Sequence, residues 1–288
     1  MSSLKKVLIT GANGFTGREM VRVLLADSSK EIYLTDRTET EVSSLRVKKC
    51  DLSDLPSVEA CIEKIQPNEI YHLVGSYTNV YDVDYISNVT TTKNILDALR
   101  SLGLKTRVLL VGSSAEYGFP LNPSKGVGED HPLLPVSVYG LVKTYQHMLM
   151  GTYVRLYGLD LVAVRPFNLL GNGVSPVLFA GKMRQEIQRY KKGEIKSIVT
   201  GDLSVERDYI DIREAITYYR LVMEQGATGE VYNVGSGKSI PLRTLMQNML
   251  VSEGLSFNSV EEGVHHIPGK IVVPKICADI TKIKRLNV

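Results

Sequence analysis

Tyr139 and Lys143 are the two residues whose types and spacing suggest proton chemistry. Residues four apart on a helix share one face and lie about one turn apart. A lysine ammonium stabilises an ionised phenol and lowers the pKa of a tyrosine from its usual value of about 10. The pair would then act as a positioned acid or base near neutral pH. The same spacing also occurs in solvated pairs on helix surfaces, so the surrounding elements must decide between the two interpretations.

A glycine-rich segment lies where a predicted strand passes into a helix near the start of the chain. Residues 7–9 are apolar, as in a strand buried on both faces, and residues 10–17 (TGANGFTG) follow. Gly11 permits a tight turn, Gly14 lets the backbone approach a pyrophosphate, and Gly17 lets helix and strand pack closely. The helix N-terminus then faces the phosphates. In this context the segment predicts dinucleotide binding rather than a purely structural turn.

The second predicted strand, residues 31–35, leads to two residues with opposite preferences for the cofactor. An acidic residue in the position of Asp36 can bind the adenosine ribose and disfavours a 2′-phosphate, whereas an arginine such as Arg37 favours one. We therefore expect NAD(H) or NADP(H) as the cofactor, with a slight preference for NAD(H).

Two further strand ends bring small or polar residues to the same crevice. Asp51 either lies beside the adenine or caps the next helix, a position for which Ser53 and Asp54 compete. A strand over residues 69–75 ends at Gly75, where an α/β sheet binds its ligands.

Ser113 and Ser114 follow an apolar strand over residues 107–112. Hydroxyl groups at the carboxyl end of such a strand are placed to hydrogen-bond a substrate oxygen. A loop rich in proline and glycine, residues 119–135, then leads to the helix that carries Tyr139.

The strand over residues 159–166 is stopped by Pro166, and beyond it the regular alternation of strands and helices weakens. Arg207 could bind a nucleotide diphosphate through a bidentate contact. It could equally form an ion pair with Asp208 or Asp211, and spacing alone does not separate the two roles.

The composition of the chain limits the classes of protein to which it could belong. The chain has 288 residues, 43% of them hydrophobic, and a formal net charge of +3. Its lysine pairs are typical of solvated faces rather than nucleic-acid contacts. Three cysteines with no metal-ligand spacing favour reduced thiols. We find no signal peptide and no membrane-spanning run, so we expect a cytoplasmic protein that binds no nucleic acid, membrane or metal.

The alternating strands and helices predict an α/β fold. We expect a Rossmann-type doubly wound parallel sheet with a smaller C-terminal α/β substrate-binding domain. Residues 1–166, completed by about 204–236, would form the NAD(P)-binding domain, and residues 167–203 and 237–288 the substrate-binding domain.

Taken together, these motifs resemble the extended short-chain dehydrogenase/reductases that act on nucleotide sugars. The resemblance covers nearly the whole chain and rests on an ordered series: residues 10–17, Asp51-Leu52, the serines after 107–112, Tyr139-x-x-x-Lys143, 165–168 (RPFN) and Arg207-Asp208. Within the family, residues 111–118, 165–171, 207–213 and 230–237 are most similar to the branch that reduces GDP-6-deoxy-4-keto-D-mannose.

The resemblance assigns roles to residues of this chain. It implies a catalytic triad of a serine, Tyr139 and Lys143; Ser113 is the preferred serine and Ser114 its neighbour. It places substrate contacts at Ser113, Asn168 and Arg207. Cofactor contacts are expected at Gly11, Asn13, Gly14, Phe15, Thr16, Gly17, Asp36, Arg37, Asp51, Leu52, Leu73, Gly75, Tyr139, Lys143 and Pro166.

The resemblance also separates the reactions of the family. Its dehydratases carry an acid two residues beyond the catalytic serine or threonine, where this chain has Ala115, with Glu116 one place later. Its 3,5-epimerase-reductases use a cysteine and a histidine, and no cysteine lies between Val74 and Lys275. Neither reaction is therefore expected.

The remaining expectation is NAD(P)H-dependent reduction of the 4-keto group of a nucleotide-linked 4-keto-6-deoxy sugar, with GDP as the nucleotide. The first alternative is an NAD-dependent nucleotide-sugar 4-epimerase, which shares the triad. The second is a non-enzymatic cofactor-binding regulator, which would not need all three triad residues. The resemblance further implies a homodimer through the Tyr139 helix and its neighbour, with apolar residues at Val89, Leu96, Leu141 and Met148.

Overall fold

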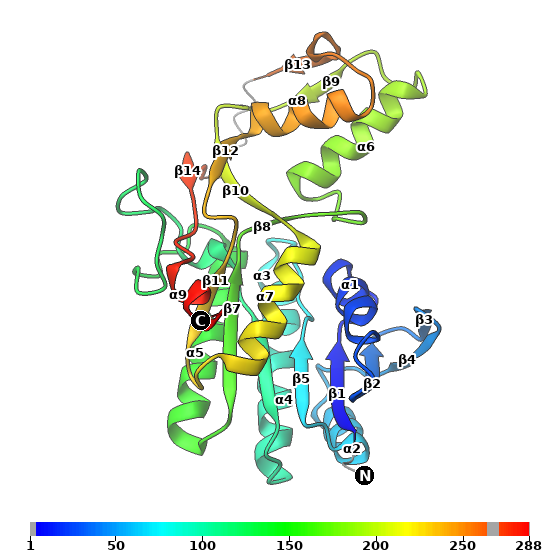
Figure 1. Cartoon of the computed structure of the whole chain (residues 1–288), viewed down its shortest axis with the longest axis vertical. Helices are drawn as coiled ribbons and strands as arrows, with labels where there is room; N and C mark the ends of the chain where they lie inside the picture. The colour runs from blue at the N-terminus through cyan, green and yellow to red at the C-terminus, as the bar shows by residue number, and fades with distance from the viewer. Residues whose placement is uncertain (1–3, 264–270, 288) are drawn as a thin grey trace.

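A twisted sheet of eight strands forms the centre of the molecule (Figure 1). The computed structural model describes residues 4–263 and 271–287, so the first three residues of the N-terminal segment lie outside it. The sheet order is β11-β7-β6-β5-β1-β2-β4-β3, and every pair is parallel except β3 with β4. The strands are β1 (Lys5–Thr10), β2 (Lys30–Asp36), β3 (Thr40–Val42), β4 (Leu45–Lys49), β5 (Glu69–His72), β6 (Arg107–Val111), β7 (Leu161–Pro166) and β11 (Val231–Val234).

Helices cover both faces of this sheet, as predicted for a doubly wound fold. Side chains alternate along a strand, so Val7 and Ile9 of β1 pack into one core and Leu8 into the other. The first core contains side chains of α1 (Phe15–Leu24) and α7 (Ile212–Gln225). The second contains side chains of α2 (Leu55–Ile65), α4 (Thr91–Ser101) and α5 (Val138–Tyr157).

A smaller lobe lies beyond the carboxyl ends of the sheet strands (Figure 1). Its helices α6 (Phe179–Lys191) and α8 (Leu242–Ser252) enclose an apolar core that includes Met183, Ile198 and Met246. Its strands are β8 (Asn168–Leu170), β9 (Ile198–Thr200), β10 (Glu206–Asp211), β12 (Ser239–Pro241), β13 (Val260–Glu262) and β14 (Lys275–Ile276). The short helix α9 (Thr281–Lys284) returns to the main unit, where Ile283 packs into the first core. The division into two domains by residue number stays a prediction.

Several elements differ from the sequence-based expectation. The helix expected from residue 82 to 102 is divided into α3 (Tyr81–Tyr85), a π-helical turn (Ile86–Thr90) and α4. The strand expected over residues 69–75 ends at His72, so Leu73 to Gly75 form an irregular segment at the edge of the crevice. The antiparallel β3 was not predicted, because a strand of three residues carries too little periodicity.

Candidate active site

The glycine turn joins β1 to α1 in a conformation that side chains would block. Gly11 has a φ of +70°, in the left-handed region that favours glycine. A Cβ at Gly17 would lie 2.2 Å from the Gly11 carbonyl oxygen and 2.8 Å from Ala12 Cα. Gly14 forms the N-cap of α1, and Phe15 and Thr16 begin the helix. The backbone amides at this helix N-terminus therefore form a cradle that suits a pyrophosphate.

Asp36 braces this turn from the end of β2. Its Oδ2 accepts the Asn13 backbone N–H at 3.0 Å, and its Oδ1 accepts the Arg37 N–H at 2.7 Å. The Asn13 side chain in turn donates to the Thr38 carbonyl at 3.1 Å. Asp36 and the exposed Arg37 therefore lie next to the glycine turn, and their role toward a cofactor stays a prediction.

Asp51 does not cap the helix that follows it. Asp54 is the N-cap of α2, and its carboxylate accepts the Ser57 N–H at 3.1 Å. Asp51 instead accepts the backbone N–H and the hydroxyl of Ser53 at 2.9 and 2.7 Å. The capping alternative for Asp51 is therefore wrong. Leu52, its neighbour, is buried, and its carbonyl accepts a hydrogen bond from Asn94.

Lys143 lies buried beside Gly75 and a polar group that lacks a partner. A Cβ at Gly75 would lie 2.6 Å from Asn88 Oδ1 and 3.3 Å from Lys143 Nζ. Asn88 is fully buried, and its Oδ1 has no hydrogen-bond partner within the described residues. Leu73 closes the same region, with its backbone 3.1 Å from the position of a Gly11 Cβ. Lys143 Nζ is a donor and Asn88 Oδ1 is an unused acceptor among the described residues, and both lie close to Gly75. This combination fits the hydroxyl groups of a ribose.

Tyr139 lies in the first turn of the same helix, but its pKa moves opposite to the expected direction. Desolvation raises the pKa of Tyr139 to about 12, and the charge of Glu116 adds to the rise, while the Ser113 hydroxyl lowers it. The Lys143 ammonium lies 5.9 Å from the ring centroid. Burial therefore outweighs the effect of this ammonium on the phenol. The phenol is therefore protonated at neutral pH and is ready to donate.

Ser113, rather than Ser114, is the hydroxyl beside Tyr139. Ser113 is the N-cap of a short 3-10 turn (Ser114–Glu116), and its Oγ accepts the Ala115 N–H at 3.1 Å. No side-chain hydrogen bond of Ser114 is formed within the described part of the chain. The geometry thus favours Ser113 as the third member of the predicted triad.

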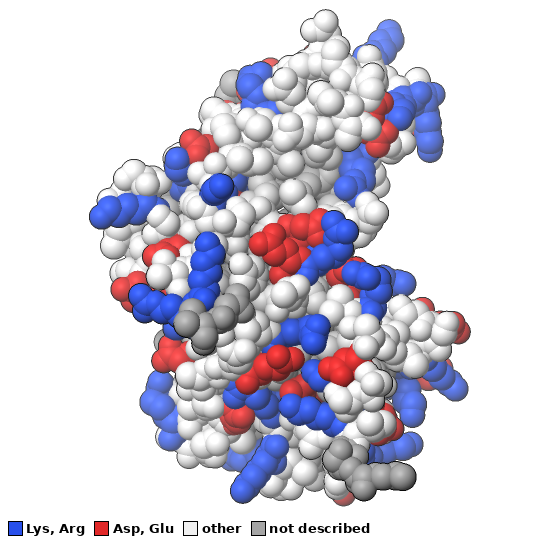
Figure 2. Space-filling model, viewed as in Figure 1, with Lys and Arg blue, Asp and Glu red and all other residues white. Residues whose placement is uncertain are grey.

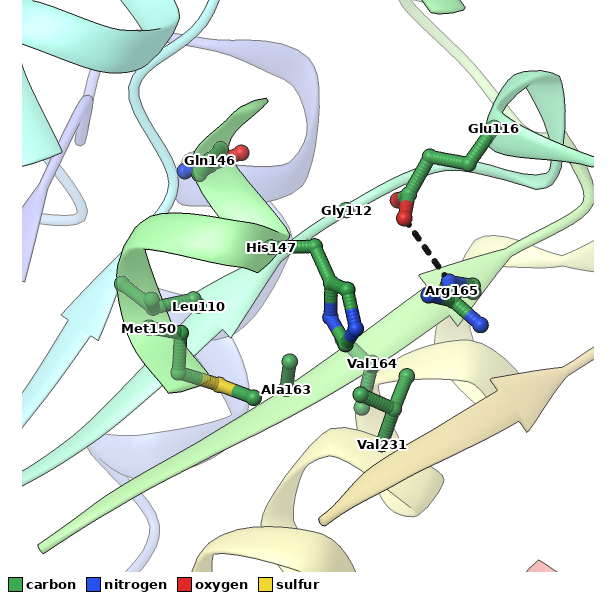
Figure 3. Close-up of a pocket in the computed structure, with 10 residues that line it drawn as sticks. All are labelled: Leu110, Gly112, Glu116, Gln146, His147, Met150, Ala163, Val164, Arg165 and Val231. Atoms are coloured by element: carbon green, nitrogen blue, oxygen red, sulfur yellow. Dashed lines mark hydrogen bonds and ion pairs between the residues drawn. The ribbon is translucent and has the colours of Figure 1, made fainter. Parts of the chain in front are cut away.

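Glu116 is fully buried and forms an ion pair with Arg165. Its Oε2 accepts from Arg165 Nε at 2.8 Å, and its Oε1 accepts the Ser113 N–H at 2.8 Å. Figure 3 shows this ion pair at the edge of a small cavity, into which His147 points from α5. Both carboxylate oxygens of Glu116 accept hydrogen bonds within the protein, one from Arg165 and one from the Ser113 backbone, so this group is not available to a substrate.

Asn168 and Arg207 lie on neighbouring strands of the second lobe. Asn168 Nδ2 donates to the Asp208 carbonyl at 2.9 Å, and Arg207 donates to the Glu206 carbonyl at 2.8 Å. Within the described residues Arg207 forms neither of the ion pairs considered for it, because Asp211 pairs with Arg213 and Asp208 binds the Ser236 and Gly237 amides. Burial lowers the pKa of Arg207, so an anion would be a favourable partner.

Sequence reasoning missed a loop that adjoins Tyr139. The ring of Tyr77 meets the ring of Tyr139 edge-on, with centroids 4.8 Å apart and planes at 85°. Asp84, fully buried, holds this loop by accepting the N–H groups of Thr78 and Asn79 at 2.9 and 2.8 Å. A single aspartate inside an apolar helical pattern carried no signal of this role.

Other features of the described residues bear on the expected partners. None of the helices in residues 4–263 and 271–287 is long and apolar enough to cross a membrane. The same residues contain no group of three or more histidine, cysteine or acidic side chains arranged for a metal ion. Figure 2 shows acidic and basic side chains mixed over the drawn face, rather than one continuous basic stripe.

Comparison with known proteins places the chain in a family. The model of the NAD dependent epimerase/dehydratase family matches residues 7–235. A putative UDP-glucose 4-epimerase of Methanocaldococcus jannaschii is 26% identical over 98% of this chain and 92% of its own length. The GDP-6-deoxy-D-mannose reductase of Pseudomonas aeruginosa is 25% identical over 84% of this chain and 78% of its own length.

Solved structures share the fold at lower identity. RMD from Pseudomonas aeruginosa, complexed with NADPH, superposes with a TM-score of 0.84 at 21% identity, covering 98% of this chain and 92% of that one. UDP-glucose 4-epimerase from Thermus thermophilus, in complex with NAD, gives 0.85 at 21% identity, with 98% and 93% covered. The predicted Rossmann-type fold is confirmed, and the family uses NAD or NADP as its cofactor, as expected. This chain belongs to the NAD-dependent epimerase/dehydratase family of nucleotide-sugar enzymes.

Proposed function

We propose that the chain reduces the 4-keto group of a nucleotide-linked 4-keto-6-deoxy sugar, with GDP as the preferred nucleotide. The observation that carries this proposal is a protonated phenol beside a carboxylate that is already paired with an arginine. Tyr139 holds its proton at neutral pH, and the nearby Glu116 is committed to Arg165. A reductase needs a proton donor at the carbonyl oxygen, whereas water elimination needs a further free acid.

The cofactor would be held by residues that already fit it. The pyrophosphate would lie on the amides of the Gly11 to Gly17 turn, and Asp36 would bind the adenosine ribose. Lys143 and Asn88 would bind the nicotinamide ribose hydroxyls as donor and acceptor beside Gly75. When bound, this cofactor supplies the hydride for the carbonyl carbon.

The side chains of this chain would supply the proton and the orientation. Tyr139 donates its proton to the carbonyl oxygen as negative charge grows there, and Ser113 donates a hydrogen bond to the same oxygen. Stabilisation that increases in the transition state raises the rate rather than the affinity. The Lys143 ammonium favours the phenolate that results. Asn168 and Arg207 would orient the sugar and its diphosphate from the second lobe.

A nucleotide-sugar 4-epimerase is the second candidate, because relatives with that name cover nearly the whole chain. It would use the same triad, first to remove a proton and then to return it. An epimerase keeps its cofactor bound and consumes none, whereas a reductase consumes reduced cofactor with every turnover.

We also propose a homodimer, through a face that shares only Met148 with the residues expected from sequence. Val89 and Leu96 are buried in the core of this chain, so they are not available to a partner. The outer face of α3 and α5 instead exposes a group of large apolar side chains: Tyr81, Val83, Tyr85, Tyr145 and Met148. Tyr81 stacks on Tyr85, and Tyr85 meets Tyr145 edge-on. Exposed apolar side chains gathered in this way are typical of a protein interface.

The deciding experiment feeds the purified protein GDP-, dTDP-, UDP- and CDP-linked 4-keto-6-deoxy sugars with NADH or NADPH. The proposal predicts loss of absorbance of the reduced cofactor in proportion to a 6-deoxy-sugar product, fastest with the GDP-linked substrate. Interconversion of 4-epimers without added cofactor would instead establish the epimerase.

A further inference from the structure

Lys143 is held by two neutral oxygen atoms rather than by a carboxylate. Its Nζ donates to the Val111 carbonyl at 2.8 Å and to Gln146 Oε1 at 3.0 Å. Lys143 and Gln146 are 3% and 2% exposed, so water cannot replace either contact. Figure 3 shows that Gln146 leaves α5 in a different direction from its neighbour His147. An ammonium removed from water needs such partners, because desolvation disfavours its charged form.

Gln146 is itself anchored by a chain of buried polar side chains. Its Nε2 donates to Thr92 Oγ1 at 2.8 Å. Thr92 Oγ1 lies 3.1 Å from His72 Nε2, and His72 Nδ1 lies 2.9 Å from Thr10 Oγ1. Thr10, His72 and Thr92 are fully buried. Because Thr10 ends β1 directly before Gly11, the chain connects Lys143 with the glycine turn.

The count of hydrogens along this chain determines the tautomer of His72. Thr92 donates its single hydroxyl hydrogen to the Asn88 carbonyl at 2.7 Å, so it can only accept from its other partners. His72 must therefore carry its hydrogen on Nε2, and its Nδ1 accepts from the Thr10 hydroxyl. Desolvation lowers the pKa of His72 to about 3, so the ring is neutral. A buried network whose members are all paired holds one arrangement.

We propose that Gln146 is a positioning residue that fixes both the place and the charge of Lys143. Its amide oxygen faces the ammonium, and the Thr92–His72–Thr10 chain keeps that amide from turning. This inference rests on the proposed function in one respect only, namely that Lys143 binds the nicotinamide ribose. The contact between Gln146 and Lys143 joins two side chains of this chain, so it can be tested in protein to which no ligand has been added.

The pKa of Lys143 also depends on the charged and titratable groups around it. Desolvation lowers the pKa of Lys143 to about 8, while Glu116 from the turn after β6 and Asp84 from α3 act to raise it. His72 from β5 is neutral, and the Tyr139 ring on the same helix lies 5.9 Å from Nζ. Neither carboxylate has a hydrogen bond to Nζ within the described residues. The neutral Gln146 amide is therefore the side chain that contacts the ammonium directly and opposes its desolvation.

The test is a titration of Lys143 by NMR in ligand-free protein with ¹³C-labelled lysine, assigned by the signal lost in Lys143→Arg. Gln146→Leu removes the acceptor at similar size and should lower the Lys143 titration by about one pH unit, because desolvation is then less opposed. Gln146→Glu places a carboxylate at the same atom and should raise it by about one unit or more. A residue with only a structural role would not move the titration in opposite directions.

Thr92→Val and Thr144→Val provide a matched comparison. Each threonine is buried and donates its hydroxyl to the carbonyl of the residue four places earlier in the chain. Only Thr92 contacts Gln146, so Thr92→Val should lower the Lys143 titration, and Thr144→Val should not. The proposal is wrong if both Gln146 variants leave the titration unchanged or shift it the same way. If neither variant folds, an unchanged titration in Thr92→Val overturns it.

A second measurement follows NADH and NADPH binding by fluorescence across the same pH range. Gln146→Leu should lower the affinity for the reduced cofactor about tenfold at pH 7, the effect of weakening one charge-assisted hydrogen bond. As the pH rises, its binding should also begin to weaken at a lower pH than in the natural chain. Gln146→Glu should extend binding to higher pH. Neither measurement uses a sugar substrate, so failure of the proposed reduction would leave these results unaffected.

Discussion

Arg165 and Glu116 form a buried ion pair that also fixes the backbone of Ser113. Arg165 Nε lies 2.8 Å from Glu116 Oε2, and the two side chains are 2% and 1% exposed. The other carboxylate oxygen accepts the Ser113 N–H at 2.8 Å. The charge pair is thus part of the support of the hydroxyl that lies beside Tyr139.

Glu116→Gln should destabilise the fold strongly. The amide keeps the shape and can still accept from Ser113, but it leaves the Arg165 guanidinium buried without a countercharge. Such a change typically costs about 3–5 kcal/mol in the free energy of unfolding, measurable with urea. Glu116→Gln combined with Arg165→Met should recover part of the loss, since no buried charge remains. Glu253→Gln, which breaks the exposed pair with Lys191, should change little.

Tyr139→Phe should retain cofactor binding and lose most of the turnover. The substitution removes the proton donor but keeps the ring against Tyr77. The loss expected for a general acid is about 10²–10⁴-fold in kcat. Cofactor affinity by fluorescence and turnover by absorbance separate the two effects. Turnover close to that of the natural chain would exclude the phenol from the acid role.

The main sheet and the glycine turn could be predicted from sequence because their signals are local. Residues 7–9 and 108–111 are continuous apolar runs, and residues 10–17 combine fixed glycine spacing with a strand on one side and a helix on the other. The same local logic placed Ser113 and Tyr139 at strand and helix ends. Local patterns did not reveal that these two residues adjoin, because their contact depends on packing between segments distant in the chain. That proximity was expected only from the resemblance to a known family.

The electrostatics of the site could not be predicted from the spacing of two residues. The four-residue spacing of Tyr139 and Lys143 suggested a lowered tyrosine pKa, but Lys143 turns towards Val111 and Gln146, and burial dominates. Asp84 could not be found for the same reason, since its partners lie in an irregular loop. Desolvation is a property of the folded chain and has no pattern in sequence.

Gly17→Ala should weaken both the fold and cofactor binding. The new methyl group would lie 2.2 Å from the Gly11 carbonyl oxygen and would separate α1 from the turn. Overpacking of this kind costs about 1–3 kcal/mol in the free energy of unfolding. Gly201→Ala is the matched control, because nothing lies within 4 Å of its Cβ position. Equal cofactor affinity in both variants would mean that the turn does not hold the pyrophosphate.

Asp36→Ala should shift the cofactor preference from NADH towards NADPH. The carboxylate that disfavours a 2′-phosphate is lost, and Arg37 remains beside the site. The ratio of NADPH to NADH affinity should rise by about tenfold, equivalent to ~1.4 kcal/mol. Asp36→Asn removes the negative charge but keeps one oxygen that can accept the Asn13 backbone N–H. It therefore distinguishes the effect of the charge from that of this hydrogen bond. If neither variant alters the ratio of the two dissociation constants, Asp36 does not set the preference.

His147→Gln should reduce the loss of stability in mild acid. Burial, with the charge of Arg165, lowers the pKa of His147 from 6.5 to about 4 in the folded chain. Between these two values the unfolded chain binds more protons than the folded one, so stability falls as the pH falls through this window. One such group contributes up to about 1.4 kcal/mol per pH unit. Urea unfolding at several pH values between those limits should show a shallower slope for the variant. An identical slope would mean that His147 is protonated alike in the folded and unfolded chains, which its burial beside Arg165 argues against.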